Sequence, residues 1–244
     1  MVFTPYLKNN MLKLILLIIT LNFTLSSFVL AQANLPKVPE TGKPETEARP
    51  GGTRTGNLED NSCNSATSLN PVSLLAQGSR DFTASEFPSF WFYLPYTQQQ
   101  VENIEFILKN PEGEQIIYRT SVELTNQPGI RKVSLPSQPE YALALDTDYL
   151  WELIIYCQAN DTPNPDIKLE GWITRVEITG EETAVQPVYQ SYIAQDILYD
   201  AVTQLAQLYH QNPDDQQYQA DWKELLELLG YVDLIEKPLV LDVP

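Results

Sequence analysis

Histidine and cysteine are nearly absent from this sequence of 244 residues, which contains one histidine, His210, and two cysteines, Cys63 and Cys157. A structural zinc site needs four ligands, so these side chains cannot complete one, and we predict no metal site. A Ser-His-Asp or Cys-His catalytic set would depend on His210 alone. That residue falls at the end of a predicted helix, where a histidine commonly only faces the negative end of the dipole.

Glycine-rich functional motifs are missing as well. The sequence has no G-x-S-x-G nucleophile motif, no GxGxxG dinucleotide motif and no glycine loop that could cradle a phosphate. We therefore predict no cofactor and name no catalytic residue. An enzymatic function stays open but is not the favoured class.

Basic residues are scarce, with 15 Lys and Arg against 32 Asp and Glu. If residues 1–33 are removed on export, two lysines leave with them, so that 13 basic residues remain against 32 acidic ones, a formal charge of −19. Such an excess repels nucleic acid and anionic membrane surfaces, so we expect no nucleic-acid partner. The acidic residues are scattered, which favours solubility and a weak attraction of cations.

Residues 1–33 have the pattern of a secretory signal peptide. A basic start, an apolar run and a small-x-small exit follow one another: Lys8 and Lys13, LKLILLIITL at residues 12–21, then Ala31 and Ala33. Met11 opens a more ordinary signal of this kind and is an alternative start. A membrane anchor is the other alternative, but the apolar run is about half of the roughly 20 residues that a spanning helix needs. We predict a periplasmic or extracellular protein that meets the membrane only through its signal.

Residues 34–60, NLPKVPETGKPETEARPGGTRTGNLED, lack aromatic residues and are rich in Pro, Gly, Thr and Glu. Such a segment cannot bury enough apolar surface to offset the entropy of ordering it, so we predict a disordered linker. The remaining 184 residues suffice for a domain with a substantial core. We assign residues 61–182 to a β-sandwich and residues 183–244 to a helical hairpin packed on it.

The two cysteines suggest a disulfide, because an exported protein with an even cysteine count commonly pairs them. A bond between Cys63 and Cys157 would close a loop of about 95 residues and stabilise the fold by up to about 4–5 kcal/mol in the chain-entropy model. The alternative is a pair of unpaired thiols, one of them buried on a strand.

Six stretches between Phe82 and Ile178 are rich in β-branched or aromatic residues and are bounded by Pro, Gly, Asn or Asp. They are FPSFWFYLPYT (87–97), NIEFILKN (103–110), GEQIIYRTSVEL (113–124), IRKVSLP (130–136), DYLWELIIYCQ (148–158) and IKLEGWITRVEI (167–178). No helical pattern separates them, which argues against a parallel α/β sheet. We predict a mainly β fold, an antiparallel β-sandwich of the Ig-like or jelly-roll-like kind.

Alternation along the strands predicts which side chains face the core. One uncharged side, expected to face inward, contains Trp151, Leu153, Ile155 and Cys157. A second inward side, on the last stretch, is assigned to Trp172, Val176 and Ile178.

The stretch FPSFWFYLPYT contains an unbroken aromatic row. Phe90 and Phe92 share one face of the strand and are expected in the core, whereas Trp91 and Tyr93 share the other. We favour a sheet covered on both faces, with the cover supplied from downstream. The alternative is a sugar-binding platform of exposed rings, formed by Trp91, Tyr93 and Tyr96.

From Ser191 the period becomes helical. The first apolar stripe contains Ile193, Ile197, Ala201, Leu205 and Leu208, and the second contains Trp222, Leu225, Leu226 and Leu229. The stretch QNPDD between them predicts a turn, with Asn212 or Asp214 as the N-cap of the second helix. Gly230 is expected to end that helix.

Paired carboxylates are the remaining option for catalysis, since glycoside hydrolysis needs two of them. Asp146 and Asp148, or Asp161 and Asp166, are the candidates, although we favour a solvated turn as the place of each pair. The same acids could hold calcium, but neither stretch has the spacing and central glycine of an EF-hand loop.

Several of these stretches together are similar to one known family. FPSFWFYLPYT, IIYRTSVEL with PGIRKVSLP, LWELIIYCQANDTPNPDIKLEGWITRV, and LYDAVTQLAQL with DWKELLELLG occur in that order at similar spacings. This arrangement resembles the exported domain-of-unknown-function family numbered 928, found mainly in photosynthetic bacteria, from about Cys63 to Leu239. The Gly-Trp pair of that family is matched by Gly171 and Trp172, whereas its Arg-Gly-rich stretch is reduced here to RPGGTRTGN. The family has no assigned activity, so the resemblance implies boundaries and export but no reaction.

We therefore expect an exported, non-catalytic binding or structural module of the periplasm or cell envelope. Its partner is expected to be an unknown envelope protein or a glycan. The alternative is a carbohydrate-binding or carbohydrate-cleaving protein that uses the aromatic strand platform.

Overall fold

The structure, a computed structural model, describes residues 35, 63, 69–76, 80–157, 166–178 and 187–241. The predicted signal peptide lies outside these residues, and of the predicted linker only Leu35 lies inside them. Leu35 is partly buried against the hydrophobic core, and its backbone N–H donates to Oε2 of Glu224 at 3.3 Å. Within the described ranges, none of the helices has the length and apolar character needed to cross a membrane.

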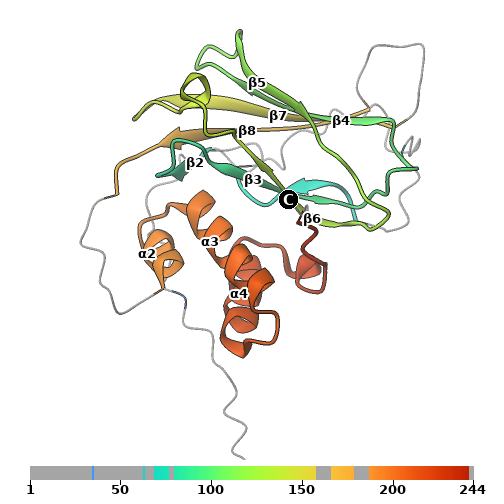
Figure 1. Cartoon of the computed structure of the whole chain (residues 1–244), viewed down its shortest axis with the longest axis vertical. Helices are drawn as coiled ribbons and strands as arrows, with labels where there is room; N and C mark the ends of the chain where they lie inside the picture. Colours follow the sequence, from blue (N-terminus) through green and yellow to red (C-terminus); the bar gives the residue numbers. More distant parts are fainter. Residues whose placement is uncertain are drawn as a thin grey trace, which may run out of the picture. The chain divides into compact units, whose positions relative to one another are not determined.

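Eight strands and three α-helices make up the described part of the chain. The strands are β1 (Val72–Ser73), β2 (Arg80–Thr83), β3 (Ser89–Leu94), β4 (Asn103–Lys109), β5 (Ile116–Ser121), β6 (Gly129–Ser134), β7 (Asp148–Tyr156) and β8 (Ile167–Arg175). The helices are α2 (Val188–Ala194), α3 (Leu198–Gln211) and α4 (Gln216–Leu228), with short 3-10 helices η1 (Pro139–Tyr141) and η2 (Val232–Leu234). The strands form a smaller sheet, β1-β3-β6, and a larger one, β2-β8-β7-β4-β5 (Figure 1). The predicted mainly β, sandwich-like fold with C-terminal helices is confirmed.

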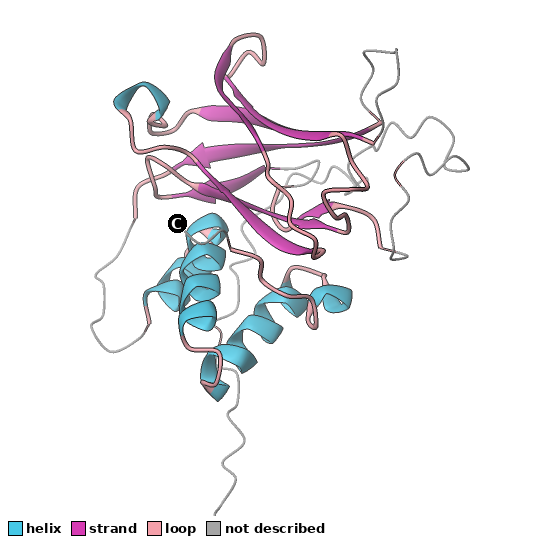
Figure 2. Ribbon diagram, turned by 45° about the vertical axis from the view of Figure 1, so that its right-hand side comes forward, coloured by secondary structure: helices cyan, strands magenta, loops and turns pink. Residues whose placement is uncertain are grey.

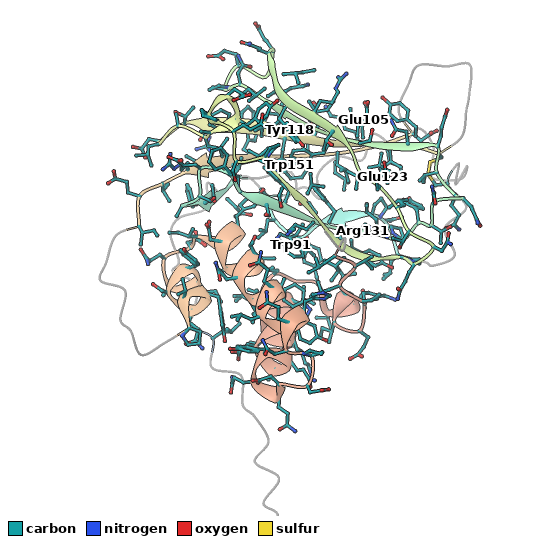
Figure 3. The ribbon with its side chains drawn as sticks, viewed as in Figure 1. Trp91, Glu105, Tyr118, Glu123, Arg131 and Trp151 are labelled. Atoms are coloured by element: carbon teal, nitrogen blue, oxygen red, sulfur yellow. A yellow bond between two sulfur atoms is a disulfide. The ribbon has the colours of Figure 1, made fainter. Side chains whose placement is uncertain are left out.

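The smaller sheet lies between most of the larger sheet and the three α-helices, and α3 also reaches β2 at the edge of the larger sheet (Figure 2). On its inner face, the ring centroids of Phe90 and Phe106 lie 4.6 Å apart, and those of Phe92 and Trp151 lie 5.6 Å apart. On its outer face, Trp91 is fully buried and its Nε1 donates to Oγ1 of Thr203 on α3 at 2.9 Å (Figure 3). The expectation that a downstream element covers the second face of β3 is confirmed.

The larger sheet differs from the prediction in one respect, because it is not wholly antiparallel. β2 pairs in parallel with β8. The two strands are far apart in the sequence, so no tight hairpin fixes their relative direction. β1 and β2 were not predicted, since two and four residues are too few to display a period of two.

The inward assignment of Trp172, Val176 and Ile178 is wrong. Trp172 is partly exposed on the outer face of the larger sheet, and β8 already ends at Arg175. Val176 and Ile178 therefore lie beyond the strand, where the alternation that was used to assign them no longer applies. Ile178 is 40% exposed.

Gly171 explains the orientation of β8. It lies opposite Trp151 of β7, which is fully buried between the sheets. A Cβ atom at Gly171 would come within 1.9 Å of the Ala76 carbonyl oxygen and 2.6 Å of the Trp151 ring. The inner position can therefore only be a glycine, and alternation then places Trp172 outside.

The helix predicted from Ser191 is divided in two, so the hairpin is corrected to three helices. Asp196 has a φ of 60°, its N–H donates to the carbonyl of Ile193, and the N–H of Ile197 donates to the carbonyl of Tyr192. These two bonds form a Schellman ending with aspartate in the position that glycine usually takes. Apolar residues continue at helical spacing across this break, so the periodicity could not reveal it.

The ends of α4 are partly as predicted. Its N-cap is Asp215, whose carboxylate accepts the N–H of Gln217 at 2.8 Å, so the assignments to Asn212 and Asp214 are wrong. Gly230 ends the helix as predicted, with a φ of 86°.

The predicted disulfide between Cys63 and Cys157 is confirmed. The two Cα atoms lie 4.7 Å apart, within the range that a disulfide spans, and both side chains are buried. The bond ties a residue ahead of β1 to the end of β7, on the inner side that Trp151 shares.

Candidate functional site

The three aromatic residues considered for sugar binding lie in the core. Trp91, Tyr93 and Tyr96 are at most 3% exposed, and burial raises the pKa of Tyr96 to about 12. A ring must be accessible on one face to stack on a sugar. A role for these residues in ligand binding stays a prediction that would require α3 to move away from β3.

The second pair of candidate carboxylates is not assembled in the described part of the chain. Asp161 lies outside it. Asp166 accepts the backbone N–H of Cys157 at 2.7 Å, so its carboxylate joins the residue that precedes β8 to the residue that follows β7.

The first pair, Asp146 and Asp148, lies in a shallow depression of about 330 Å³ at one end of the larger sheet. We call this depression the Trp172 pocket; it is lined by Arg80, Pro111, Asp146, Thr147, Asp148 and Trp172. Its volume is at the lower end of the range for small-molecule sites, about 300–1,000 Å³.

Three strands position the side chains of the Trp172 pocket. Trp172 of β8 lies between Arg80 of β2 and Leu150 of β7 in the register of the sheet, so these three share its outer face. Arg80 reaches diagonally to Asp148, with Nη2 2.5 Å from Oδ2. The other carboxylate oxygen of Asp148 accepts the hydroxyl of Thr174. Asp148 is therefore engaged by two partners.

The turn before β7 forms a rigid rim of the pocket. Asp146 has a φ of 52°, a left-handed conformation that aspartate tolerates better than most residues, and its N–H donates to the Arg175 carbonyl at 2.8 Å. The hydroxyl of Thr147 donates to the carbonyl of Leu145 at 3.0 Å. The guanidinium of Arg175 also donates to the Leu143 carbonyl, at 2.9 Å. These bonds hold the rim before any ligand binds.

The carboxylate of Asp146 is available to a ligand. Among the residues that the structure describes, it forms no hydrogen bond and no ion pair, and Asp146 is exposed. The pocket thus combines a partly exposed indole ring, an internal ion pair and a free carboxylate.

Two of the pocket's residues, Asp146 and Asp148, were predicted as site candidates from the sequence, whereas Arg80 and Trp172 were not. Arg80 gave no signal because it begins a strand too short to recognise. Trp172 could have been found from Gly171, since a glycine inside a strand often marks a close approach on its own face and leaves its neighbour on the other.

A buried charge cluster adjoins the pocket on the same face. Glu152 is 4% exposed, and its carboxylate oxygens lie 2.7 Å from Nζ of Lys109 and 2.5 Å from Nζ of Lys168. Burial acts to raise the pKa of Glu152, but the hydrogen bonds and charges of the two lysines outweigh it and hold the pKa below 4.5. Lys168 also contacts Glu170 at 2.8 Å. Glu152 is therefore a charged structural group with its oxygens occupied.

A second, smaller depression of about 130 Å³ lies where α3 meets β2 and β3. Its acid is Asp200, whose Oδ2 accepts the hydroxyl of Thr83 at 2.7 Å and the N–H of Ala84 at 2.9 Å. Burial raises the pKa of Asp200. The carboxylate joins the first turn of α3 to the end of β2, so its contacts explain its position without a ligand.

Other reactive groups do not converge on the Trp172 pocket. His210 lies exposed in the last turn of α3, and the disulfide engages both cysteines of the chain. Within the described ranges, no group of three or more His, Cys, Asp or Glu side chains is arranged to hold a metal ion. The arrangement in the pocket is suited to binding a polar ligand against an aromatic ring.

Comparison of the chain with curated proteins and with solved structures found no match. The family described as Domain of Unknown Function (DUF928) matches residues 49–239, most of the chain. This range includes both sheets and the three helices described above. The chain therefore belongs to the DUF928 family.

Proposed function

We propose that this protein is an exported, non-catalytic binding module of the periplasm or cell envelope, and that it binds carbohydrate in the Trp172 pocket. The observation that carries the proposal is the position of Trp172, a large aromatic side chain that is partly exposed beside two carboxylates and a guanidinium. A tryptophan left outside a well-packed core, within a depression lined by polar groups, is typical of a binding site.

Carbohydrate is the ligand class that suits this set of side chains. The apolar face of a sugar ring packs on an indole, while its hydroxyl groups can donate to Asp146 and accept from Arg80. Asp148 is engaged by Arg80 and Thr174, which fixes the guanidinium beside the ring. Such a site orients a sugar without attacking it.

Export is supported by the disulfide. Bonds of this kind form and persist in oxidising compartments such as the periplasm, and are rare in the cytosol. Cys63 and Cys157 are paired and buried, as expected for a structural bridge. The secretory pattern of residues 1–33 points to the same compartment.

The proposal is tested by binding to a glycan array and to purified cell-wall material. We expect the wild-type protein to bind a subset of glycans, and Trp172→Ala to bind them about tenfold more weakly, because the stacking surface is lost. Tyr218→Ala, which removes a partly exposed ring from α4, is the matched control and should bind like wild type. No glycan bound by the wild type, or equal binding by Trp172→Ala, would overturn the proposal.

A further inference from the structure

Building on the proposed function, we infer that the ligand of the Trp172 pocket carries a positive charge, and that it is an amino sugar whose amine is free and protonated. The charged side chains that line the pocket, and the ion pair that two of them form, point to this class of sugar.

The pocket has an uncompensated negative charge. One guanidinium, of Arg80, and two carboxylates, of Asp146 and Asp148, line it. Arg80 and Asp148 lie 2.5 Å apart and neutralise each other. The carboxylate of Asp146 is left over, with no partner of opposite charge among the described residues, so a cation in the pocket would gain a charge-assisted contact.

The aromatic ring favours the same charge. An indole attracts a cation to its face through the ring quadrupole, and tryptophan does so best among the aromatic side chains. An ammonium group on a sugar that stacks on Trp172 could therefore contact the ring and Asp146 together.

The position of Asp146 is fixed in advance. Its backbone N–H is bonded to the Arg175 carbonyl, and the neighbouring Thr147 is bonded to the Leu145 carbonyl. A carboxylate on a rigid turn binds its partner without a further cost for ordering the backbone.

The charge of the whole molecule acts in the same direction. The chain has a formal net charge of −17, which attracts cationic ligands over a distance and repels acidic glycans. An anionic sugar would be repelled by this field, and the charge of Arg80 is already neutralised by Asp148. A free amine meets neither obstacle.

The test compares two ligands of equal length by isothermal titration calorimetry with the full exported chain. One is a tetramer of β-1,4-linked glucosamine with free amines, and the other is the same tetramer fully N-acetylated. At a pH where the amines are protonated, we expect the free-amine tetramer to bind about tenfold more tightly, the size of one hydrogen bond to a charged group.

Asp146→Asn isolates the charge. Asparagine tolerates a positive φ at least as well as aspartate, so the turn should be kept while the negative charge is lost. The variant should bind both tetramers with equal affinity, whereas Asp233→Asn, an exposed change on η2, should keep the preference for the amine. Thermal melting of each variant verifies that the fold is intact.

The outcomes separate the two proposals. Equal binding of both tetramers, or a preference for the acetylated one, overturns the charge inference and leaves the proposed function standing if Trp172→Ala abolishes the binding. A preference for the amine that survives in Asp146→Asn also overturns the inference. Absence of binding to either tetramer, together with a blank glycan array, overturns the proposed function itself.

Discussion

The two sheets of the sandwich each have an outer face, and the two outer faces differ sharply. On the smaller sheet, Trp91 and Tyr93 point outward and are covered by the helix layer, with Trp91 bonded to Thr203 of α3. On the larger sheet, Trp172 points outward among charged groups, and the three α-helices lie on the opposite side of the sandwich (Figure 1).

Whether an outward aromatic residue on a strand belongs to the core therefore depends on whether another layer covers it. Trp91 and Trp151 stabilise the layers by burying their full surface. No described helix packs on Trp172. It is surrounded by the Arg80–Asp148 ion pair, the carboxylate of Asp146 and the turn before β7. A tryptophan there contributes little to the core, and it is the residue on which the proposed binding site depends.

The largest expected effect tests the core side of this comparison. Trp151→Ala should lower the free energy of unfolding by about 3–5 kcal/mol, because it removes a fully buried ring that packs against Phe92. Trp172→Ala, the matched control, should lower it by about 1 kcal/mol or less. Urea denaturation measures both, and equal losses would contradict the division into core and surface tryptophans.

An intermediate effect is expected from the charge cluster on the outer face. Glu152→Gln should cost about 1–3 kcal/mol at pH 7, because it leaves Lys109 and Lys168 facing each other without their shared carboxylate. Since the pKa of Glu152 is lowered by folding, its contribution to stability is present above about pH 4.5 and is lost as the pH falls through the folded pKa.

The measurement is the urea midpoint of wild type and Glu152→Gln at pH 7 and at pH 3. The difference between the two urea midpoints should be smaller at pH 3 than at pH 7. A difference that is the same at both pH values would show that the carboxylate does not act through its charge.

The smallest effect is expected under the helix layer, from Asp200 of α3, which is bonded to the end of β2. Burial raises the pKa of Asp200 above 3.8, so its contribution to stability depends on pH in the opposite way to that of Glu152. The contribution is fully present below pH 3.8 and is lost as the pH rises through the folded pKa. Asp200→Asn can still accept from Thr83 and Ala84, so we expect a change of about 1 kcal/mol or less at pH 7.

Acidification should therefore stabilise wild type relative to Asp200→Asn, whereas it should destabilise wild type relative to Glu152→Gln. Parallel denaturation series from pH 7 to pH 3 measure the two differences. If both differences changed with pH in the same direction, the assignment of opposite pKa shifts to Glu152 and Asp200 would be wrong.

Much of the fold could be predicted from the sequence where the period of the chain is unambiguous. β7 is nine residues long, and its uncharged side, with Trp151 and Leu153, is the buried side as expected. β3 is bounded by Pro88 and Pro95, which end it as proline should. The disulfide was predicted from the even cysteine count together with the predicted export.

Other features depend on contacts between distant segments and leave no local pattern. Asp196 ends α2 because two backbone bonds close a turn there, although the apolar stripe continues past it. The inward prediction for Trp172 rests on the side of the strand that it shares with Val176 and Ile178, but the inner space at Gly171 is already filled by Trp151 and the backbone of Ala76. Local periodicity gives no information about which of two faces a neighbour has occupied.

The candidate site was only half predictable for the same reason. Asp146 and Asp148 stand out as acids next to a strand, whereas Arg80 joins them from a segment more than 60 positions earlier through the pairing of β2 with β8. Topology brings these groups together, and a single sequence does not display it.

The pairing of β2 with β8 has a consequence for the order in which the larger sheet is assembled. β8 lies between β2 and β7 in the larger sheet, yet it falls outside the covalent ring closed by Cys63 and Cys157, which contains both of its neighbours. β8 follows the whole ring in the sequence, so β2 gains its strand partner only when this late segment inserts beside it. The larger sheet is thus completed from the C-terminal side, and a chain that stops before Ile167 leaves β2 without a hydrogen-bonding neighbour.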